Sequence, residues 1–327
     1  MAKNKLRRIG VLCSGGDSSG MNPCIRAVVR SALYYDLEPF GIKRGFQGLL
    51  EGEIEPMHAR SVSNIISRGG TILKTSRCPE FLKKPGRAQG IAGLQTFGIE
   101  ALVVIGGDGS FRGAHLLSQE WDGRVVGIPG TIDNDIEGTD FTIGYDTAVN
   151  VAVDALDKIR DTAASHDRLF FVEVMGRNSG YIALEAGISA GAEDILIPET
   201  PTDMDALSRD LLRGRGHGKT SSVVVVAEGD ETGGAMTVAA EVEKRTGIKA
   251  RVTILGHLQR GGSPTAFERV LASRLGLAAV RALRDGKDDV MVGVLQNRIA
   301  HSPLDKRERP RKPIPEELLE LSRILAI

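Results

Sequence analysis

Two carboxylates stand two residues apart in the run Pro129-Gly-Thr-Ile-Asp133-Asn-Asp135, which follows the apolar run Val125–Ile128. A carboxylate at the end of a strand can take the proton of a hydroxyl group, while cations spread the charge of a transferring phosphoryl group. We therefore predict a catalytic loop with Asp133 as the base. The alternative is a turn that an Asp side chain closes by hydrogen bonds to its own backbone.

Two glycine-rich turns that contain an aspartate also follow apolar runs. Ser14-Gly-Gly-Asp17 follows Ile9–Leu12, and Gly106-Gly-Asp-Gly-Ser110 follows Ala101–Ile105. Glycine lets a polyphosphate approach the backbone, whose N–H groups at strand ends and helix starts can hold phosphate. Asp108 repels phosphate, so its place in such a turn favours a Mg²⁺ ion between them. The alternative is an Asp that forms a turn or caps a helix.

Arginines near predicted strand ends could bind phosphate oxygens through their planar guanidinium groups, although each alone is also typical of an ordinary surface residue. His257 lies between two of them. Glu228 follows the apolar run Val223–Ala227, where its carboxylate could accept sugar hydroxyls or simply face solvent. The arginines are Arg77, Arg168, Arg177, Arg251 and Arg260.

Two common nucleotide-binding motifs are missing. Gly214–Thr220 ends in Gly-Lys-Thr, but Arg213 stands where a P-loop requires glycine, and Val223 begins a strand rather than a helix. No predicted strand leads into a GxGxxG turn, which argues against a nicotinamide-dependent dehydrogenase.

The elements that must position these residues alternate along the chain, because short β-branched runs are separated by longer helical patterns. This predicts an α/β fold of two domains, with mainly parallel sheets covered by helices. A length of 327 residues, 41% of them hydrophobic, supports two domains rather than one. The strand runs are Ile9–Leu12, Ala101–Ile105, Val125–Ile128, Leu169–Val172, Val223–Val226 and Val290–Val294; helical spacing covers Met21–Ala32, Val149–Ile159 and Glu316–Leu325.

The charge and cysteine content restrict the partners. Lys+Arg and Asp+Glu both number 42, so no net field attracts nucleic acid or an anionic membrane, and local clusters must hold any anion. Cys13, Cys24 and Cys78 form no CxxC pair, which argues against a disulfide framework or zinc site and favours a reducing cytoplasm.

No apolar stretch approaches the roughly 20 residues that span a bilayer, and the N-terminal one is too short for a signal peptide. We expect a cytoplasmic protein.

From Ile9 to about Val294 the chain resembles the bacterial phosphofructokinases. The resemblance implies an ATP-dependent 6-phosphofructokinase of glycolysis, which transfers the γ-phosphate of Mg-ATP to the 6-hydroxyl of fructose 6-phosphate. It also implies a homotetramer, with a larger ATP-binding domain of residues 1–144 plus 258–308 and a smaller sugar-phosphate-binding domain of residues 145–257 plus 309–327. The motifs are Ser14-Gly-Gly-Asp17, Gly20-Met-Asn22, Gly106–Ser110, Pro129–Asp135, Met175-Gly-Arg177 and Gly256–Gly262.

The resemblance assigns roles by position. Asp133 looks like the base, with Thr131 and Asp135 beside it, and Asp108 like the Mg²⁺-associated carboxylate, while Arg177 and Arg77 would stabilise the transferring group. The ATP-binding positions are Gly15, Phe46 (in place of a tyrosine), Arg77, Cys78, Asp108, Gly109, Ser110 and Gly113. The sugar-phosphate positions are Thr131, Asp133, Arg168, Met175, Gly176, Arg177, Glu228, Arg251, His257 and Arg260, with Arg168 and Arg251 expected from a neighbouring subunit.

Gly109 and Gly130 bear on the phosphate donor. Pyrophosphate-dependent relatives typically have aspartate and lysine there, and an aspartate would repel an α-phosphate. The alternatives are a pyrophosphate-dependent phosphotransferase, which glycine at both positions argues against, and a regulatory subunit without catalysis.

Five residues match positions that bind ADP or phosphoenolpyruvate in regulated relatives, but Ala59, His217 and Ser221 depart from the basic residues usual there. The five are Arg26, Arg30, Arg160, Glu193 and Lys219.

Overall fold

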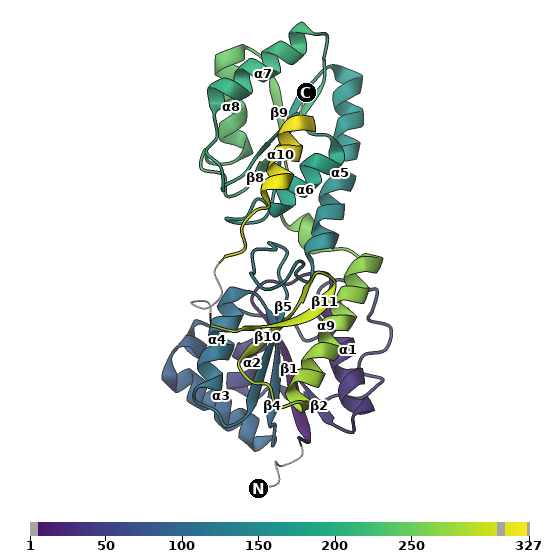
Figure 1. The fold of residues 1–327 in the computed structure, drawn as a ribbon, viewed down its shortest axis with the longest axis vertical. Helices are drawn as coiled ribbons and strands as arrows, with labels where there is room; N and C mark the ends of the chain where they lie inside the picture. Colours follow the sequence, from purple (N-terminus) through teal and green to yellow (C-terminus); the bar gives the residue numbers. More distant parts are fainter. Residues whose placement is uncertain (1–5, 306–310, 326–327) are drawn as a thin grey trace. The chain divides into compact units, whose positions relative to one another are not determined.

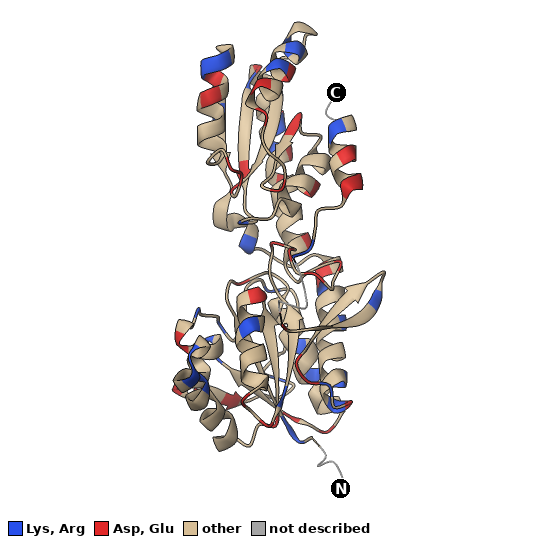
Figure 2. Ribbon diagram, turned by 60° about the vertical axis from the view of Figure 1, so that its left-hand side comes forward, with Lys and Arg blue, Asp and Glu red and all other residues tan. Residues whose placement is uncertain are grey.

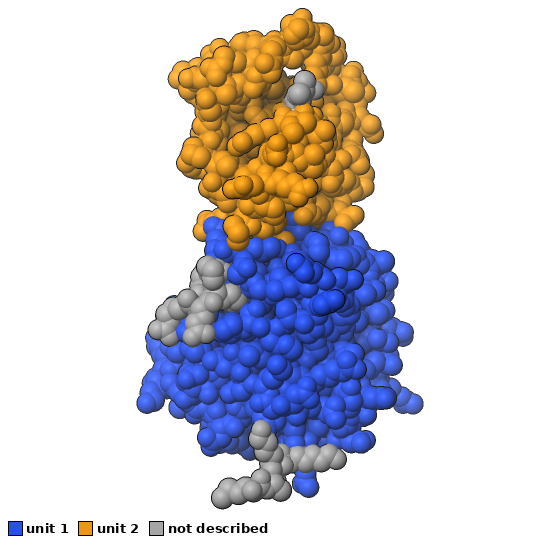
Figure 3. Space-filling view, viewed as in Figure 1, with its two compact units in different colours: residues 1–131, 136–147, 260–312 blue, residues 132–135, 148–259, 313–327 orange. Residues whose placement is uncertain are grey.

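The computed structural model describes residues 6–305 and 311–325, and the chain divides into two compact units (Figure 3). Unit 1 comprises Met1–Thr131, Ile136–Thr147 and Arg260–Lys312, and unit 2 comprises Ile132–Asp135, Ala148–Gln259 and Pro313–Ile327. The divisions after Thr147 and Gln259 lie within three residues of the domain limits given above. The limit at 308/309 falls outside the described residues.

Unit 1 is built on a seven-stranded sheet of order β11-β10-β5-β4-β1-β2-β3 (Figure 1). Its five inner strands are parallel, and the two edge strands, β3 and β11, are antiparallel to their neighbours. The strands are β1 (Arg8–Ser14), β2 (Glu38–Ile42), β3 (Ile54–Pro56), β4 (Ala101–Gly106), β5 (Arg124–Pro129), β10 (Val290–Leu295) and β11 (Arg298–Pro303).

Helices cover both faces of this sheet (Figure 1). Alternate residues of β1 point to opposite faces: Val11 packs in the core formed with α1 and α9, and Leu12 in the core formed with α2, α3 and α4. Burial on both faces explains the nearly continuous apolar runs. The helices of unit 1 are α1 (Met21–Tyr34), α2 (Gly45–Glu51), η1 (Pro79–Leu82), α3 (Lys84–Thr96), α4 (Asp108–Ser118) and α9 (Ala266–Arg284).

Unit 2 has a four-stranded, all-parallel sheet of order β7-β8-β6-β9. One of its cores packs α7 and α8 against the sheet, and α10 lies against α6 (Figure 1). The strands are β6 (Leu169–Val174), β7 (Asp194–Leu196), β8 (Ser222–Ala227) and β9 (Ala250–Ile254); the helices are α5 (Tyr145–His166), which begins in unit 1, α6 (Tyr181–Ala190), α7 (Met204–Gly216), α8 (Ala235–Thr246) and α10 (Glu316–Leu325), and the 3₁₀ helix η2 (Gly256–Arg260) spans the division between the units.

The predicted α/β fold is confirmed, and all six apolar runs form strands. The terminal helix Glu316–Leu325 is also confirmed. Five strands were not anticipated: β2 contains proline and glycine, β3 and β7 have three residues each, and β9 and β11 are edge strands with several exposed side chains.

Acidic and basic residues are interspersed over the helices of each unit (Figure 2). Among the described residues, no helix combines the length and apolar character needed to cross a bilayer.

Candidate active site

The two glycine-rich turns lie next to each other at the carboxyl edge of the unit 1 sheet. β1 and β4 are neighbouring parallel strands, with Ser14 opposite Gly106, and the Ser110 Oγ donates a hydrogen bond to the Ser14 carbonyl (2.9 Å). Gly15 has φ +92°, which favours glycine, and a Cβ on Gly106 would lie 2.5 Å from the Ser14 oxygen. Glycine is therefore required at both positions.

α4 begins at Asp108, within the second turn. Its N-cap is Gly107, which has no side chain to accept hydrogen bonds from the first N–H groups of the helix. Asp108 is the first helical residue, so it does not occupy the N-cap position that the capping alternative would require. A Cβ on the exposed Gly109 would meet no atom within 4 Å. The backbone therefore leaves open space in front of the helix start.

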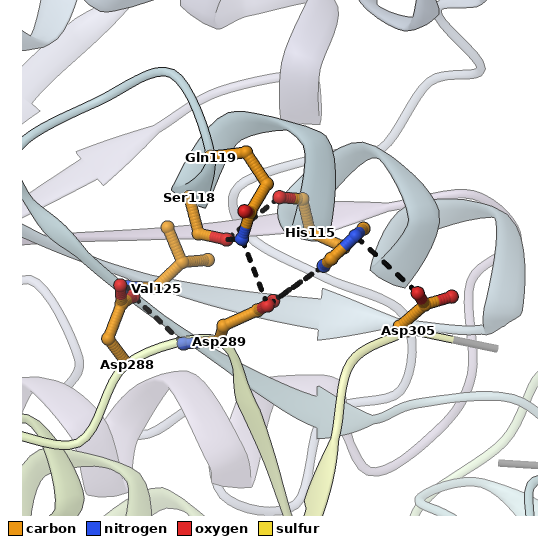
Figure 4. Close-up of polar contacts among 7 residues, drawn as sticks. All are labelled: His115, Ser118, Gln119, Val125, Asp288, Asp289 and Asp305. Atoms are coloured by element: carbon orange, nitrogen blue, oxygen red, sulfur yellow. Dashed lines mark hydrogen bonds and ion pairs between the residues drawn. The ribbon is translucent and has the colours of Figure 1, made fainter. Parts of the chain in front are cut away.

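The far end of α4 is fixed by a polar cluster (Figure 4). His115 Nδ1 lies 2.8 and 3.0 Å from the two Asp289 oxygens, and its Nε2 lies 3.7 Å from Asp305. Gln119 donates to Asp289 (3.2 Å), and burial raises the pKa of that carboxyl group. These contacts tie α4 to the segments on either side of the β10–β11 hairpin, which fixes the axis along which Asp108 and Ser110 are presented.

The other predicted ATP-binding residues surround the same turns. Gly15 N–H donates weakly to the Ser76 carbonyl (3.5 Å), and the Thr75 hydroxyl donates to the Gly15 carbonyl (3.0 Å), so Arg77 and Cys78 follow a segment that borders Gly15. A Cβ on Gly113 would lie 3.0 Å from the ring of Phe46.

Phe46 itself is buried and stacks on Phe81, with ring centroids 4.0 Å apart and planes 12° apart. One face of the ring is therefore already covered by protein.

The predicted catalytic loop is divided between the units. Thr131 belongs to unit 1, where its carbonyl accepts a hydrogen bond from the Thr142 hydroxyl (2.6 Å). Asp133 belongs to unit 2, where its carbonyl accepts from the Ser179 hydroxyl (2.7 Å). Asn134 has φ +50°, so the loop does make a tight turn, as the alternative proposed.

Unlike a solvated turn residue, Asp133 is buried, with its side chain 8% exposed. Its Oδ2 lies 4.0 Å from the Nε of Arg177, whose side chain is 56% exposed. A buried carboxylate beside a solvent-exposed arginine is suited to accept a hydrogen bond from a ligand hydroxyl group and to take its proton.

The carboxyl edge of the unit 2 sheet collects several predicted sugar-phosphate residues. Met175–Arg177 follow β6, Glu228 follows β8 and His257 follows β9. Glu228 Oε1 accepts hydrogen bonds from the N–H groups of Gly176 (3.2 Å) and Arg177 (2.7 Å), where φ is +142° and +54°.

Two further residues at this edge were not predicted. Gln259 is fully buried, accepts from the Met175 N–H (3.3 Å) and donates to the Gly256 carbonyl (3.1 Å). Ser179 holds the Asp133 backbone. Neither side chain is charged, so only their tertiary contacts indicate these roles.

Arg168 and Arg251 lie at the opposite, amino-terminal edge of the same sheet. Arg168 precedes β6, and Arg251 pairs with Phe170 near the start of that strand. Met175 lies seven residue steps after Arg168 along the extended strand, or about 23 Å at about 3.3 Å per step. A single chain therefore does not bring these two arginines to Glu228 and His257.

Arg260 belongs to unit 1 and lies against the first glycine-rich turn. Its Nη1 donates to the Asp17 carbonyl (3.0 Å), and a Cβ on Gly16 would lie 2.8 Å from the same nitrogen. The glycine at position 16 therefore makes room for this guanidinium group.

The predicted effector residues form one group in each unit. In unit 2, Glu193 lies 3.5 Å from Arg160 and 3.2 Å from Lys219. In unit 1, Arg26 and Arg30 are one helical turn apart on α1, and burial together with the charge of Arg30 lowers the pKa of Arg26.

Within residues 6–305 and 311–325, no three His, Cys, Asp or Glu side chains converge as a metal cage would require. Asp108 offers one carboxylate at a turn suited to phosphate. Mg²⁺ is usually held by one or two carboxylates together with substrate phosphates, so this arrangement fits a Mg²⁺ ion that arrives with a nucleotide.

Comparison with known proteins gives consistent results. A family profile described as Phosphofructokinase matches residues 8–283. The chain is 55% identical over 322 residues to "ATP-dependent 6-phosphofructokinase 1" of Thermus thermophilus, covering 98% of this chain and 100% of that protein. It is 54% identical to "ATP-dependent 6-phosphofructokinase" of Halalkalibacterium halodurans, with the same coverage.

Solved structures show the same fold. A phosphofructokinase from Saccharomyces cerevisiae superposes with a TM-score of 0.86 at 36% identity, over 98% of this chain and 46% of that one. A pyrophosphate-dependent phosphofructokinase from Marinobacter aquaeolei has a TM-score of 0.84 at 22% identity, over 98% of this chain and 92% of that one. At that identity the second likeness concerns the fold alone.

Proposed function

This chain belongs to the phosphofructokinase family, and we propose that it is an ATP-dependent 6-phosphofructokinase. It transfers the γ-phosphate of ATP to the 6-hydroxyl of fructose 6-phosphate, giving fructose 1,6-bisphosphate and ADP in glycolysis. The observation that carries this proposal is the identity of more than half of the residues, over nearly the full chain, with relatives named for ATP. Glycine at position 109, which places no carboxylate there to repel an α-phosphate, also favours ATP.

Unit 1 binds the donor in this proposal. The turn at Gly15 and the start of α4 hold phosphate oxygens, and Ser110 keeps the two turns in register. Phe46, Cys78 and Gly113 line the nucleotide, and Arg77 neutralises charge on the phosphates. Asp108 holds Mg²⁺, which supplies charge neutralisation on the transferring group.

Most residues that contact the acceptor in this proposal belong to unit 2. Asp133 takes the proton of the 6-hydroxyl, and Arg177 beside it stabilises charge on the phosphoryl group. Glu228 and His257 hydrogen-bond sugar hydroxyls, while Met175 and Gly176 shape the surface between them. Thr131 and Asp135 flank the base and orient the reacting groups, and Arg260 binds the sugar phosphate.

The remaining sugar-phosphate contacts, Arg168 and Arg251, come from a neighbouring subunit of a homotetramer. Their place at the opposite edge of the unit 2 sheet supports a contribution to another chain's site. Two groups contribute to an effector site for a phosphorylated ligand between subunits, Arg26 and Arg30 in unit 1 and Arg160, Glu193 and Lys219 in unit 2. A glycolytic role and three free thiols favour the cytoplasm, with small anionic ligands rather than nucleic acid or membrane as partners.

The test is the initial rate of fructose 1,6-bisphosphate formation from fructose 6-phosphate and Mg²⁺, with ATP or pyrophosphate as donor at matched concentrations. Turnover with ATP is expected. Turnover with pyrophosphate alone would favour the pyrophosphate-dependent alternative. Turnover with neither donor would favour a subunit without catalysis.

A further inference from the structure

Three helices of unit 1 begin around one buried carboxyl group, that of Glu268. Its Oε2 accepts hydrogen bonds from the N–H and the hydroxyl of Thr147 in the first turn of α5, each 3.2 Å long. Its own N–H donates to the side chain of Thr265, the N-cap of α9 (3.1 Å). A Cβ on Gly20, the N-cap of α1, would lie 3.1 Å from Oε1.

The neighbouring side chains close this arrangement. The Thr265 N–H donates to the Thr147 hydroxyl (3.3 Å), and the Thr265 hydroxyl bonds to the Asp146 carboxylate. We call Asp146, Thr147, Thr265 and Glu268 the Glu268 cluster. Every hydroxyl in it both donates and accepts, so the starts of α5 and α9 are held together by side chains as well as by packing.

A carboxyl group at this place is costly. Glu268 has no exposed surface, and burial, with the nearby Asp146 charge, raises its pKa to about 7. An apolar side chain of similar size would fill the space without that cost. The group is therefore more than a filler of volume.

The segments that the cluster joins are the ones that hold the first glycine-rich turn. Four residues before the cluster's Thr265, the Gly261 carbonyl accepts from the Ser19 hydroxyl (3.0 Å), and Arg260 donates to the Asp17 carbonyl. Two residues before α5, the Ile143 carbonyl accepts from the Ser18 hydroxyl (2.9 Å). The Asp17–Ser19 segment is thus bound to both sides of the cluster, through the Ser18 and Ser19 hydroxyls and the Asp17 carbonyl, which closes a ring.

We propose that Glu268 is a positioning residue for sugar-phosphate recognition, because it locks the starts of α5 and α9 and so fixes Arg260 against the Gly16–Asp17 turn. The inference rests on the proposed function, in which Arg260 binds the phosphate of fructose 6-phosphate. Glu268 is buried and touches no ligand in that scheme. Its loss should therefore change affinity for the sugar phosphate more than the rate of the chemical step.

The test compares Glu268→Leu, Thr147→Val and Glu268→Gln with the wild-type enzyme, by calorimetric titration of fructose 6-phosphate and by steady-state kinetics. Leu removes the acceptor, and Val removes its hydroxyl partner at nearly constant shape. We expect both to weaken binding about tenfold with kcat within about twofold. Gln keeps an acceptor for Thr147 and should bind as the wild type does.

Unchanged affinity in folded Glu268→Leu and Thr147→Val, whatever their melting temperatures, would overturn the inference and leave a structural role. If Glu268→Leu does not fold, Thr147→Val, which removes a single hydroxyl, decides alone. Failure of the proposed function is separable, because it shows in the wild-type enzyme alone, as turnover with pyrophosphate only or as no binding of fructose 6-phosphate.

Discussion

Replacing Gly109 by aspartate should impair use of ATP without disturbing the fold. Position 109 is exposed at the start of α4, and a Cβ there meets no atom within 4 Å. An aspartate in the first turn of a helix is electrostatically favourable, so stability should be retained. The new carboxylate would instead face the phosphates of the proposed donor.

The size of the effect follows from Coulomb's law. Two unit charges about 7 Å apart interact by about 2.4 kcal/mol at an effective dielectric constant of about 20. Because position 109 is exposed, solvent screening reduces this to about 1–2 kcal/mol, which corresponds to about a 5- to 30-fold loss in kcat/KM for ATP.

The matched control is Gly109→Asn, which has the same shape without the charge. The assay is initial-rate kinetics with varied Mg-ATP at saturating fructose 6-phosphate, with melting temperatures for both variants. Equal kcat/KM for the Asp and Asn variants would refute the electrostatic argument. Gly130→Lys is a poorer test, because a Cβ there would lie 2.9 Å from the buried Ile105 and disturb packing as well as charge.

The remaining predictions concern other parts of the molecule. Arg168→Ala should raise KM for fructose 6-phosphate at least about tenfold and change KM for ATP less than about twofold. Replacing the exposed Arg213 by alanine should change neither KM. Equal increases in both KM values for Arg168→Ala would contradict the assignment. Gly130→Ala should lower the free energy of unfolding by about 1–3 kcal/mol through overpacking. A free energy of unfolding equal to that of the wild type, measured by urea denaturation, would disprove this. Glu268, whose pKa is raised to about 7 when folded, stabilises the protein below its unfolded pKa and loses that contribution as pH rises to about 7. The free energy of unfolding of Glu268→Gln relative to wild type should therefore rise by about 3 kcal/mol between about pH 4 and pH 8. If the urea midpoints of the two proteins change equally with pH, this is ruled out.

Much of the fold could be predicted because its signals are local. The inner strands are buried on both faces, so Val103 and Val104 read as one apolar run although they belong to opposite cores. The glycine-rich turns were predictable for a similar reason, since the backbone near Gly15 and Gly106 excludes side chains. β9 could not be recognised, because an edge strand with an exposed arginine resembles a loop in sequence.

The candidate site was predictable where charge or glycine marks it, and not where neutral residues act through contacts. Asp133 stood out as a carboxylate after a strand, but the Ser179 hydroxyl that holds its carbonyl is 46 residues away in sequence. Gln259 likewise supports the site only because the fold places its side chain where it accepts the hydrogen bond of the Met175 N–H. Such roles depend on tertiary neighbours that no local pattern records.

The two edges of the unit 2 sheet separate arginines that look alike in sequence. Arg168 and Arg177 flank the same strand, β6, and each could be read as a phosphate ligand at a strand end. In a parallel sheet, however, the amino ends of all strands lie at one edge and their carboxyl ends at the other. A ligand held by Glu228 is therefore within reach of Arg177 and out of reach of Arg168 in the same chain. If both arginines bind sugar phosphate, one strand must serve two sites in an assembly, its carboxyl end in its own chain's site and its amino end in another's. Affinity for the sugar phosphate would then depend on subunit contacts in a way that affinity for the nucleotide does not.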